Sequence, residues 1–332
     1  MTAEPSARRA VPWRALLALL ALGSVLLVAL LPSPYAIERP GPVFDALGRA
    51  ETKGTPTPLI DVPGRTTYPT SGSLDVLTVS VIGTPTAGPP WVDLAAAWLD
   101  PAQSVVPLEA VYPAGQTLGD ADRQGAEQMT AAQQGAIAAA LTRLGYPVRG
   151  TVRVTQVQPG TAAAGRLKAG DVVHSFAGRP VIDSCSLQDL VLSHGTAPSA
   201  VDLQRAGATT SVQVTPRLTA VGGGKRPLLG VVTSSSYTFP FPVRLRLNDV
   251  SGPSAGMMFA LGIVDKLTPG ALTGGRSVAG TGTICGDGAV GAIGGIAQKM
   301  VAARRAGATV FLAPASNCDE VLGHVPDGLD VY

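Results

Sequence analysis

The apolar and polar positions divide the chain into an apolar N-terminal run, an α/β stretch and two regions of mixed strands and helices. Alternating apolar positions predict strands, and apolar positions three or four residues apart predict helices. We expect helices over residues 91–99, 120–144, 186–193, 254–267, 296–306 and 314–320. We expect strands over residues 43–46, 59–62, 74–81, 151–157, 172–176, 201–203, 211–214, 229–233, 243–247, 277–284 and 309–313. The predicted fold class is therefore α+β, with several domains.

The longest apolar run covers residues 13–31 and is interrupted by Arg14 near its start. Its length suits one membrane span of about 20 residues. Basic residues precede the run and none follows it directly, which predicts a cytoplasmic N-terminus and an extracytoplasmic remainder. A cleavable signal peptide is the alternative. Because the run is long for such a peptide and Pro32-Ser33-Pro34 replaces a small-residue cleavage site, we expect an uncleaved single-pass anchor in the cell membrane.

Length, charge and cysteine content limit the functions that the chain can have. A chain of 332 residues predicts about two to three domains. Its formal charge of +2, with no basic run, gives no reason to expect a nucleic-acid partner. The three cysteines include no C-x-x-C pair, so we expect no metal site and no cofactor. The segment from 220 to 226 contains G-G-G-K but lacks the spacing of a phosphate loop, so we expect no ATP binding.

Two stretches carry candidate chemistry. Ser254 lies in N-D-V-S-G-P-S-A-G, and Lys299 lies in G-A-I-G-G-I-A-Q-K-M-V-A-A-R-R-A-G. A serine becomes nucleophilic when a base takes its proton. A lysine can be that base when apolar surroundings or a helix N-terminus favour its neutral form. Both conditions are predicted for Lys299, and the backbone N–H groups of Gly252 and Ala255 are natural donors to an oxyanion.

These stretches resemble the proteolytic domain of Lon-type serine peptidases over roughly residues 227–331. The resemblance implies that Ser254 is the nucleophile, that Lys299 is the general base and that Thr281, in T-G-T-I, helps to hold the lysine. It also implies a ribosomal protein S5 domain 2-like α/β fold and a hexameric ring. Ser251 and Thr283 depart from the acidic residues that are usual in the ATP-dependent enzymes of this family.

Three alternatives to this peptidase are weighed. A lone serine between glycines is usually a turn residue, and a lysine in an alanine-rich helix usually extends into solvent. G-P-S-A-G also fits G-x-S-x-G, with Asp287 and His324 in the order of a Ser-His-acid hydrolase, but too few strands precede Ser254 for that sheet. A third possibility is a binding protein or scaffold whose peptidase domain is inactive.

Residues 150–219 carry a second pattern, in which T-V-R-V-T-Q-V is followed by P-G-T-A-A-A-G-R-L-K-A-G-D-V-V and F-A-G-R-P-V. This resembles a PDZ domain of the bacterial protease type. A PDZ domain binds an extended peptide as an added strand and holds its terminal carboxylate on backbone N–H groups. By position, Leu144, Gly145 and Tyr146 are the candidate carboxylate loop, and the strand from Thr151 is the expected groove edge.

The resulting prediction is a membrane-anchored, ATP-independent PDZ domain-containing Lon-type serine protease that acts on polypeptides. Its predicted segments are a cytoplasmic end (1–12), an anchor (13–31), a juxtamembrane α/β region (32–143), a PDZ-like domain (144–219), a linker (220–226) and a proteolytic domain (227–332). In an exported chain one disulfide could form. Because Cys285 and Cys318 both lie in the peptidase-like region, they are the expected pair, and three free thiols are the alternative.

Overall fold

The computed structural model describes residues 13–52, 55–221, 224–247 and 250–332. The predicted cytoplasmic residues 1–12, and Asn248 and Asp249 at the start of the serine motif, lie outside the described residues. The chain forms two compact units. The first comprises residues 1–40 and 79–121, and the second comprises residues 41–78 and 122–332.

The first unit begins with the helix α1 (Trp13–Leu30). The start of strand β1 (Tyr35–Asp45) pairs antiparallel with β6 (Ser104–Pro107). The helix α2 (Trp91–Trp98) buries Leu94 and Ala97 against Ile37, because these two apolar residues lie three positions apart on one helix face. The short helix α3 (Leu108–Val111) follows β6. The helix predicted over residues 91–99 is confirmed.

A membrane-spanning helix is not found in the part of the chain that the structure describes. The helix α1, which covers most of the run predicted to be an anchor, has 18 residues.

The second unit contains a sheet that joins distant parts of the sequence. Strand β5 (Ser73–Ile82) lies parallel to β16 (Ser277–Gly280), with Ser73 opposite Ser277. Beyond β16 come β19 (Val310–Leu312) and β20 (Asp330–Val331), both parallel. Residues 73–76 therefore share one sheet with the C-terminal region. The boundary predicted between a juxtamembrane region and a proteolytic domain is wrong, because strand pairing unites the two.

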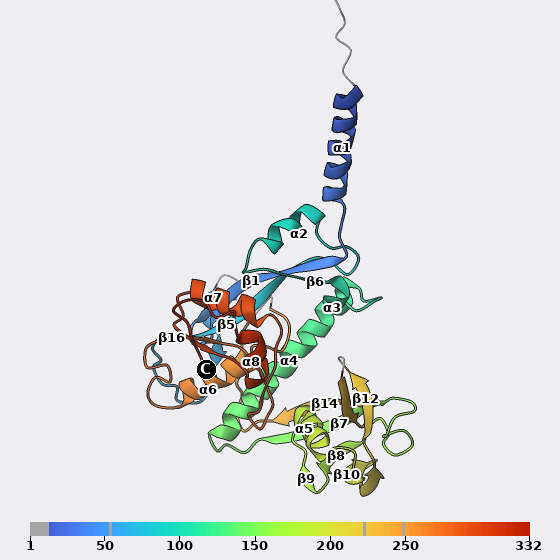
Figure 1. Ribbon diagram of the computed structural model, residues 1–332. Coiled ribbons are helices and arrows are strands. Elements are labelled where there is room, and N and C mark those ends of the chain that lie inside the picture. Colours follow the sequence, from blue (N-terminus) through green and yellow to red (C-terminus); the bar gives the residue numbers. More distant parts are fainter. Residues whose placement is uncertain (1–12, 53–54, 222–223, 248–249) are drawn as a thin grey trace, which may run out of the picture. The chain divides into compact units, whose positions relative to one another are not determined.

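Three helices pack with this sheet in the second unit (Figure 1). They are α4 (Leu118–Arg143), α6 (Gly256–Leu267) and α7 (Ile296–Arg305). A core cluster combines Leu74 of β5, Ile137 of α4 and Phe259 of α6, all buried. These apolar positions recur at helical spacing in the sequence, which is why the three helices were predictable.

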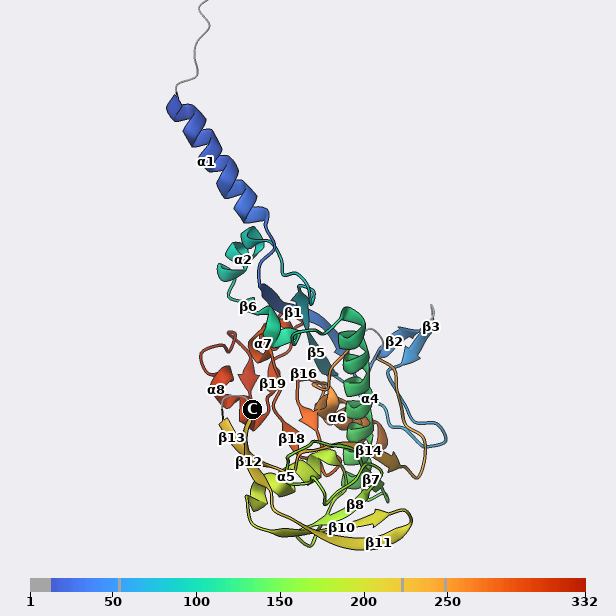
Figure 2. The same ribbon diagram turned by 90° about the vertical axis from the view of Figure 1, so that its right-hand side faces the viewer.

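A β-rich module lies within the second unit and appears yellow-green in Figures 1 and 2. Its sheet has the strand order β11–β10–β8–β7–β14, and β9 pairs with β8. The strands are β7 (Arg149–Val157), β8 (Val172–Phe176), β9 (Arg179–Pro180), β10 (Ser199–Arg205), β11 (Ala208–Val214) and β14 (Val231–Thr238). The helix α5 (Ser184–His194) begins at an Asp183 capping box.

The boundary predicted for this module was wrong at its C-terminal side. Residues 229–233 were predicted to open the proteolytic domain, but β14 pairs along its whole length with β7, with Val231 opposite Val157. The predicted linker lies in a hairpin formed by β12 (Arg217–Val221) and β13 (Gly224–Leu228). The hairpin strands are largely exposed and show no regular alternation of apolar and polar residues, so the sequence pattern did not separate them from a linker.

Short elements complete the fold. Strand β2 (Arg49–Thr52) pairs with β3 (Thr55–Pro58), and β4 (Ile60–Asp61) pairs with β15 (Arg244–Leu245). Strand β17 (Thr283–Ile284) pairs with β18 (Val290–Gly291), so the strand predicted over residues 277–284 is broken after Gly280. A 3-10 turn (Ala315–Asn317) and α8 (Cys318–Val321) precede β20.

Candidate functional site

Ser254 lies in the turn that leads into α6 and is half-buried. Its carbonyl oxygen accepts two hydrogen bonds, from the Gly282 N–H at 2.9 Å and from the Thr281 hydroxyl at 3.1 Å. The Met257 N–H donates to the Gly282 carbonyl at 3.1 Å, so the first turn of α6 is held by the segment after β16. The segment lies between α6 and β18, because a Cβ on Gly282 would lie 3.3 Å from the Met257 Cβ and 2.8 Å from the Val290 Cγ1.

Lys299 and Thr281 meet inside the protein. Lys299 is 3% exposed, Thr281 is fully buried, and the Lys299 Nζ donates to the Thr281 Oγ1 at 3.2 Å. Gly295, with a φ of 67°, begins α7 and places Lys299 in its first turns. A neutral lysine amine is the form that can accept a proton from a serine. The structure thus brings Lys299, Thr281 and the backbone of Ser254 together.

The two predicted oxyanion donors differ in their availability. Gly252 has a φ of 91°, and its N–H donates to the carbonyl of Gly125 in α4 at 3.1 Å. This hydrogen bond occupies the donor, so the prediction for Gly252 is wrong for this arrangement of the loop. Ala255 is buried at the N-terminus of α6, where backbone N–H groups point out of the helix. It stays the candidate donor.

The alternative triad is not assembled in the described part of the chain. Asp287 lies in the β17–β18 turn, where its carboxylate accepts from the Ala289 N–H. His324 is exposed after α8. Among the described residues, no hydrogen bond joins either side chain to Ser254. The Lys299 amine, in contrast, bonds the Thr281 hydroxyl, which in turn bonds the Ser254 carbonyl.

The predicted carboxylate loop is wrong. The N–H groups of Leu144, Gly145 and Tyr146 donate to the carbonyls of Ala140, Thr142 and Leu141, where they close the C-terminus of α4. The Tyr146 ring packs edge-on against Phe241 with a centroid distance of 5.0 Å, and the Arg65 guanidinium lies over both rings. These donors are occupied by the helix and cannot hold a peptide carboxylate.

A groove lies instead between α5 and the start of β14. Its cavity of about 480 Å³ is lined by Leu187, Gln188 and Val191 of α5 and by residues 227–231 and 233. The turn at Leu229-Gly230 is fixed because their carbonyls accept from the Ala163 and Gln158 N–H groups. The sequence signal that was missed is P-L-L-G-V, an apolar run with one glycine directly before a strand.

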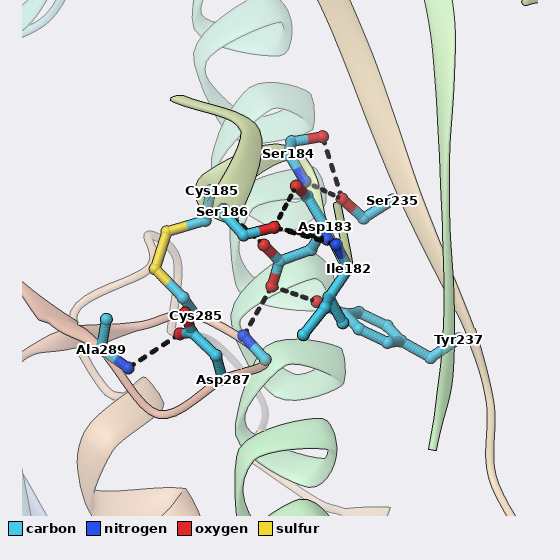
Figure 3. Close-up of a disulfide and its surroundings, with 11 residues drawn as sticks. Ile182, Asp183, Ser184, Cys185, Ser186, Ser235, Tyr237, Cys285, Asp287 and Ala289 are labelled. Carbon is cyan, nitrogen blue, oxygen red and sulfur yellow. Dashed lines mark hydrogen bonds between the residues drawn. A yellow bond between two sulfur atoms is a disulfide. The ribbon is translucent and has the colours of Figure 1, made fainter. Parts of the chain in front are cut away.

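The helix α5 is joined to the β17–β18 turn by a disulfide between Cys185 and Cys285 (Figure 3). The predicted pairing of Cys285 with Cys318 is wrong. Cys318 is free and exposed in α8. The residues that pair are 100 positions apart in sequence, and only folding of the β-rich module next to the turn brings their Cα atoms to 5.7 Å.

A buried carboxylate reinforces the same junction. Asp183 accepts from the Ser186 N–H at 2.6 Å, the Tyr237 hydroxyl at 2.8 Å and the Gly286 N–H at 2.6 Å (Figure 3). Burial, together with the charge and hydrogen bond of Asp183, raises the pKa of the Tyr237 phenol, which therefore stays a donor. Asp183 ties α5, β14 and the β17–β18 turn to one another.

The same region contains a group with metal-ligand spacing. Cys185, Cys285 and Asp189 offer ligand atoms within 4.8 Å of one another. Because the two cysteines form a disulfide, they present no thiolate to a metal ion. These residues do not fit a metal centre.

Comparison with known proteins shows a similarity in the part of the chain that contains this site. Residues 249–330 match the family model of the Lon protease (S16) C-terminal proteolytic domain. The chain is 40% identical over 78 residues to a Lon protease from Clostridioides difficile, covering 24% of this chain and 10% of that protein. It is 48% identical over 66 residues to a Lon protease from Citrifermentans bemidjiense, covering 20% and 8%. The chain therefore spans a tenth or less of the length of these relatives.

Two solved structures that are similar to a quarter of this chain are PDZ domains. One, from an SdrC-like protein of Listeria monocytogenes, is 19% identical, covers 25% of this chain and 85% of that chain, and has a TM-score of 0.23. The corresponding domain from Listeria innocua is 20% identical, covers 25% and 92%, and also has a TM-score of 0.23. The chain thus has PDZ-like structural neighbours, and the groove described above rests on its own geometry.

Proposed function

We propose that this chain is a serine endopeptidase that uses Ser254 as nucleophile and Lys299 as general base. The observation that carries the proposal is the buried hydrogen bond between Lys299 and Thr281, whose hydroxyl also bonds the Ser254 carbonyl. These two hydrogen bonds support the pairing, because one buried hydroxyl contacts both the lysine amine and the turn that carries the serine. The similarity of residues 249–330 to a Lon proteolytic domain supports the same chemistry.

The reaction follows from these roles. The Ser254 Oγ attacks a peptide carbonyl carbon while its proton passes to the Lys299 Nζ. The oxyanion is stabilised at the N-terminus of α6, with the Ala255 N–H as the proposed donor. The C–N bond then breaks, and the departing amine takes the proton from Lys299. Water, deprotonated by the neutral Lys299, hydrolyses the ester that remains on Ser254.

The proposed substrates are polypeptides, and the PDZ-like module is the proposed binding site for a substrate or partner peptide. The apolar groove between α5 and β14 supports this role. We further propose that the reaction needs no ATP, since the sequence has no phosphate-binding motif. A hexameric ring, implied by the family resemblance, completes the proposal, and light scattering of the purified chain would measure it.

The location of the protein is a proposal as well. We propose that residues 13–31 anchor it in the cell membrane, with the later domains outside the cytoplasm. The exposure of Leu19, Leu27 and Val28 on α1 and the presence of a disulfide support this placement. Protease treatment of intact cells should degrade the C-terminal domains. Carbonate washing of membranes should leave the chain in the membrane fraction, and its release would contradict an anchor.

The proposed activity is tested with casein as an unfolded substrate. The full chain is compared with Ser254→Ala and Lys299→Ala. We expect the unchanged chain alone to cleave casein, with no effect of added ATP. Cleavage by all three proteins would point to another nucleophile. Cys318→Ser is the control, because Cys318 lies outside the site. Loss of cleavage in this variant alone would also contradict the assignment.

A further inference from the structure

The exposed side of α2, in the first unit, is apolar. Trp91, Ala95 and Trp98 lie four and three positions apart, so their side chains share one side of the helix. Val92 and the C-cap residue Leu99 are seven positions apart and lie on the same side. Trp98 is 64% exposed and Leu99 is 86% exposed. Exposed apolar residues that gather on one face mark an interaction surface, whereas those scattered singly do not.

The opposite side of α2 is covered by the protein itself. Leu94 and Ala97 are buried and pack against Ile37 of β1. The single charged residue of the helix, Asp93, is exposed at the boundary between the two sides. A helix that is apolar on all sides is normally buried on all sides, in a protein core or in a membrane. Within the described part of the chain, nothing covers the outer side of α2 in this way.

The start of α2 is tied to the end of α1. The Trp91 N–H donates to the Leu31 carbonyl at 3.3 Å, and Pro32 forms an isolated bridge with Pro90. Residues 31–34 are all that separates α1 from β1, against which α2 packs. The apolar side of α2 therefore lies next to the C-terminal end of α1 and cannot leave it without breaking these contacts.

A lipid surface is the partner that fits this position. Apolar side chains of α1 such as Leu27 and Leu30 are exposed, and so is Leu31 directly after the helix. If α1 is the anchor, its C-terminal end lies where the acyl chains meet the headgroups. Tryptophan is enriched at that depth because its ring has a large apolar body and one polar N–H. Trp91 and Trp98 supply two such rings to the outer side of α2.

The charges of the first unit indicate apolar insertion and not electrostatic attraction. Beyond α1 its acidic residues outnumber its single basic residue, Arg39. A surface that binds anionic headgroups by charge carries a cluster of lysines and arginines instead. Contact with lipid would therefore gain its free energy from burial of apolar surface. The acidic residues are Glu38, Asp93, Asp100, Glu109 and Asp120.

We propose that α2 is a membrane-docking helix that lies in the interface of the outer leaflet, with its Trp91 and Trp98 side buried about 5–10 Å at the boundary of headgroups and acyl chains. The proposal rests on the membrane anchor proposed above and does not depend on the peptidase function. The helix α2 forms a second attachment beside α1. Two attachments hold the first unit against the bilayer and prevent it from turning about the axis of α1.

The first test places one probe on each side of α2 in the full chain, reconstituted in phosphatidylcholine vesicles. Cys318→Ser removes the exposed free thiol, and Ala95→Cys or Asp93→Cys then receives a nitroxide label. Both positions are exposed, and two residues apart on a helix they point to different sides. The ratio of collisions with oxygen to collisions with an aqueous nickel complex should be roughly fivefold higher at position 95, because oxygen dissolves among acyl chains and the polar complex stays in water.

The second test uses the fluorescence of Trp98. Trp13→Phe combined with Trp91→Phe leaves Trp98 as the single tryptophan. Lipids with brominated acyl chains should quench about half of its emission or more, and iodide in the water should quench little. Leu99→Asp, added to this variant, should reverse the pattern because a carboxylate resists burial in lipid. Leu322→Asp is the matched control, since Leu322 is 72% exposed on the second unit and should leave the quenching unchanged.

The outcomes separate docking from anchoring. Equal collision ratios at positions 93 and 95, or quenching of Trp98 by iodide alone, would overturn docking. Quenching by neither agent would show that another copy of the chain covers this side, which also overturns contact with lipid. A chain that resists carbonate washing while Trp98 stays in water would leave the anchor standing without docking. Release by carbonate would overturn the anchor and docking together, and casein cleavage measures the peptidase function separately.

Discussion

Lys299 donates a hydrogen bond of 3.2 Å to Thr281 in the interior of the second unit. Both side chains are buried, and the Thr281 hydroxyl passes its own hydrogen bond on to the carbonyl of Ser254 at 3.1 Å. The hydroxyl therefore couples the position of the lysine to that of the nucleophile's turn. The proposed catalytic pair depends on a third residue that takes part in neither proton transfer nor attack.

This coupling predicts the effect of changing Thr281. Thr281→Val keeps the shape but removes both hydrogen bonds, so kcat for casein should fall by about 10² or more. Thr281→Ser should restore most of the activity because the hydroxyl returns. Thermal unfolding of both variants serves as the control. Equal activity of Thr281→Val and the unchanged chain would show that Lys299 is positioned by other contacts.

Close packing of α4 on the serine loop predicts a second effect. A Cβ on Gly125 would lie 2.6 Å from the Ser251 Cβ, and the Gly125 carbonyl holds the Gly252 N–H. Gly125→Ala should therefore displace the loop and lower kcat at least about tenfold.

A glycine elsewhere in α4 provides the control for Gly125→Ala. A Cβ on Gly119 would meet only the Thr117 hydroxyl, at 4.0 Å. Gly119→Ala should keep full activity and gain less than the about 0.5–1 kcal/mol of a helix interior, because Gly119 is the second residue of α4. Loss of activity in both variants would indicate a general effect on α4, and loss in neither would contradict the role of Gly125.

The disulfide should contribute strongly to stability. Cys185 and Cys285 close a loop with a sequence separation of 100 residues, so the chain-entropy estimate for their bond is about 4.7 kcal/mol. Cys185→Ser should lower the denaturant midpoint by a corresponding amount, and a reductant should have the same effect on the unchanged chain. Cys318→Ser should leave the midpoint in place, because this thiol is free. An unchanged midpoint in Cys185→Ser would contradict the pairing.

The buried Asp183 should be sensitive to loss of its charge. Its carboxylate accepts hydrogen bonds from Ser186, Tyr237 and Gly286. An asparagine would place its NH2 group, which cannot accept a hydrogen bond, opposite at least one of these donors. Asp183→Asn should destabilise the chain by about 2–3 kcal/mol in denaturant unfolding. Asp189→Asn is the control, since burial and the neighbouring charges of Asp287 and Asp183 raise the pKa of Asp189 and make its charge unfavourable. That variant should be neutral or slightly stabilising.

Acid should weaken the β-rich module through Asp171. The hydrogen bond from Arg205, at 2.7 Å, lowers the pKa of this buried carboxyl below its usual value of 3.8. Its contribution is present above pH 3.8 and is lost as the pH falls through the lower folded-state pKa. Thermal scans from pH 6 to pH 2 should show a steeper loss of Tm for the unchanged chain than for Asp171→Asn. Parallel profiles would contradict this linkage.

The residues of the candidate site are visible in the sequence because they lie in local motifs. Ser254 in a glycine-rich turn before an apolar helix, and Lys299 at the start of another helix, are visible in the sequence alone. The hydrogen bonds among Lys299, Thr281 and Ser254 agree with the predicted roles. The catalytic assignment itself stays a proposal until the variants are assayed.

The peptide groove and the disulfide were not predictable in the same way. The loop at Leu144 to Tyr146 has a suitable sequence position, but its N–H groups close α4. The strand that forms the groove, β14, follows the rest of the module and pairs back with β7. No local pattern shows which strands, far apart in the sequence, will pair with each other, since register depends on burial of the whole sheet.

By itself, the sequence determined the helices, most strands and the residues able to carry peptidase chemistry, because hydrophobic period and glycine-rich turns act over a few residues. The tertiary structure decided that β5 joins β16, that Cys185 pairs with Cys285 and that Gly252 is bound by Gly125. Each of these pairs is far apart along the chain. Such contacts form only when many buried side chains pack together, and no single segment contains that information.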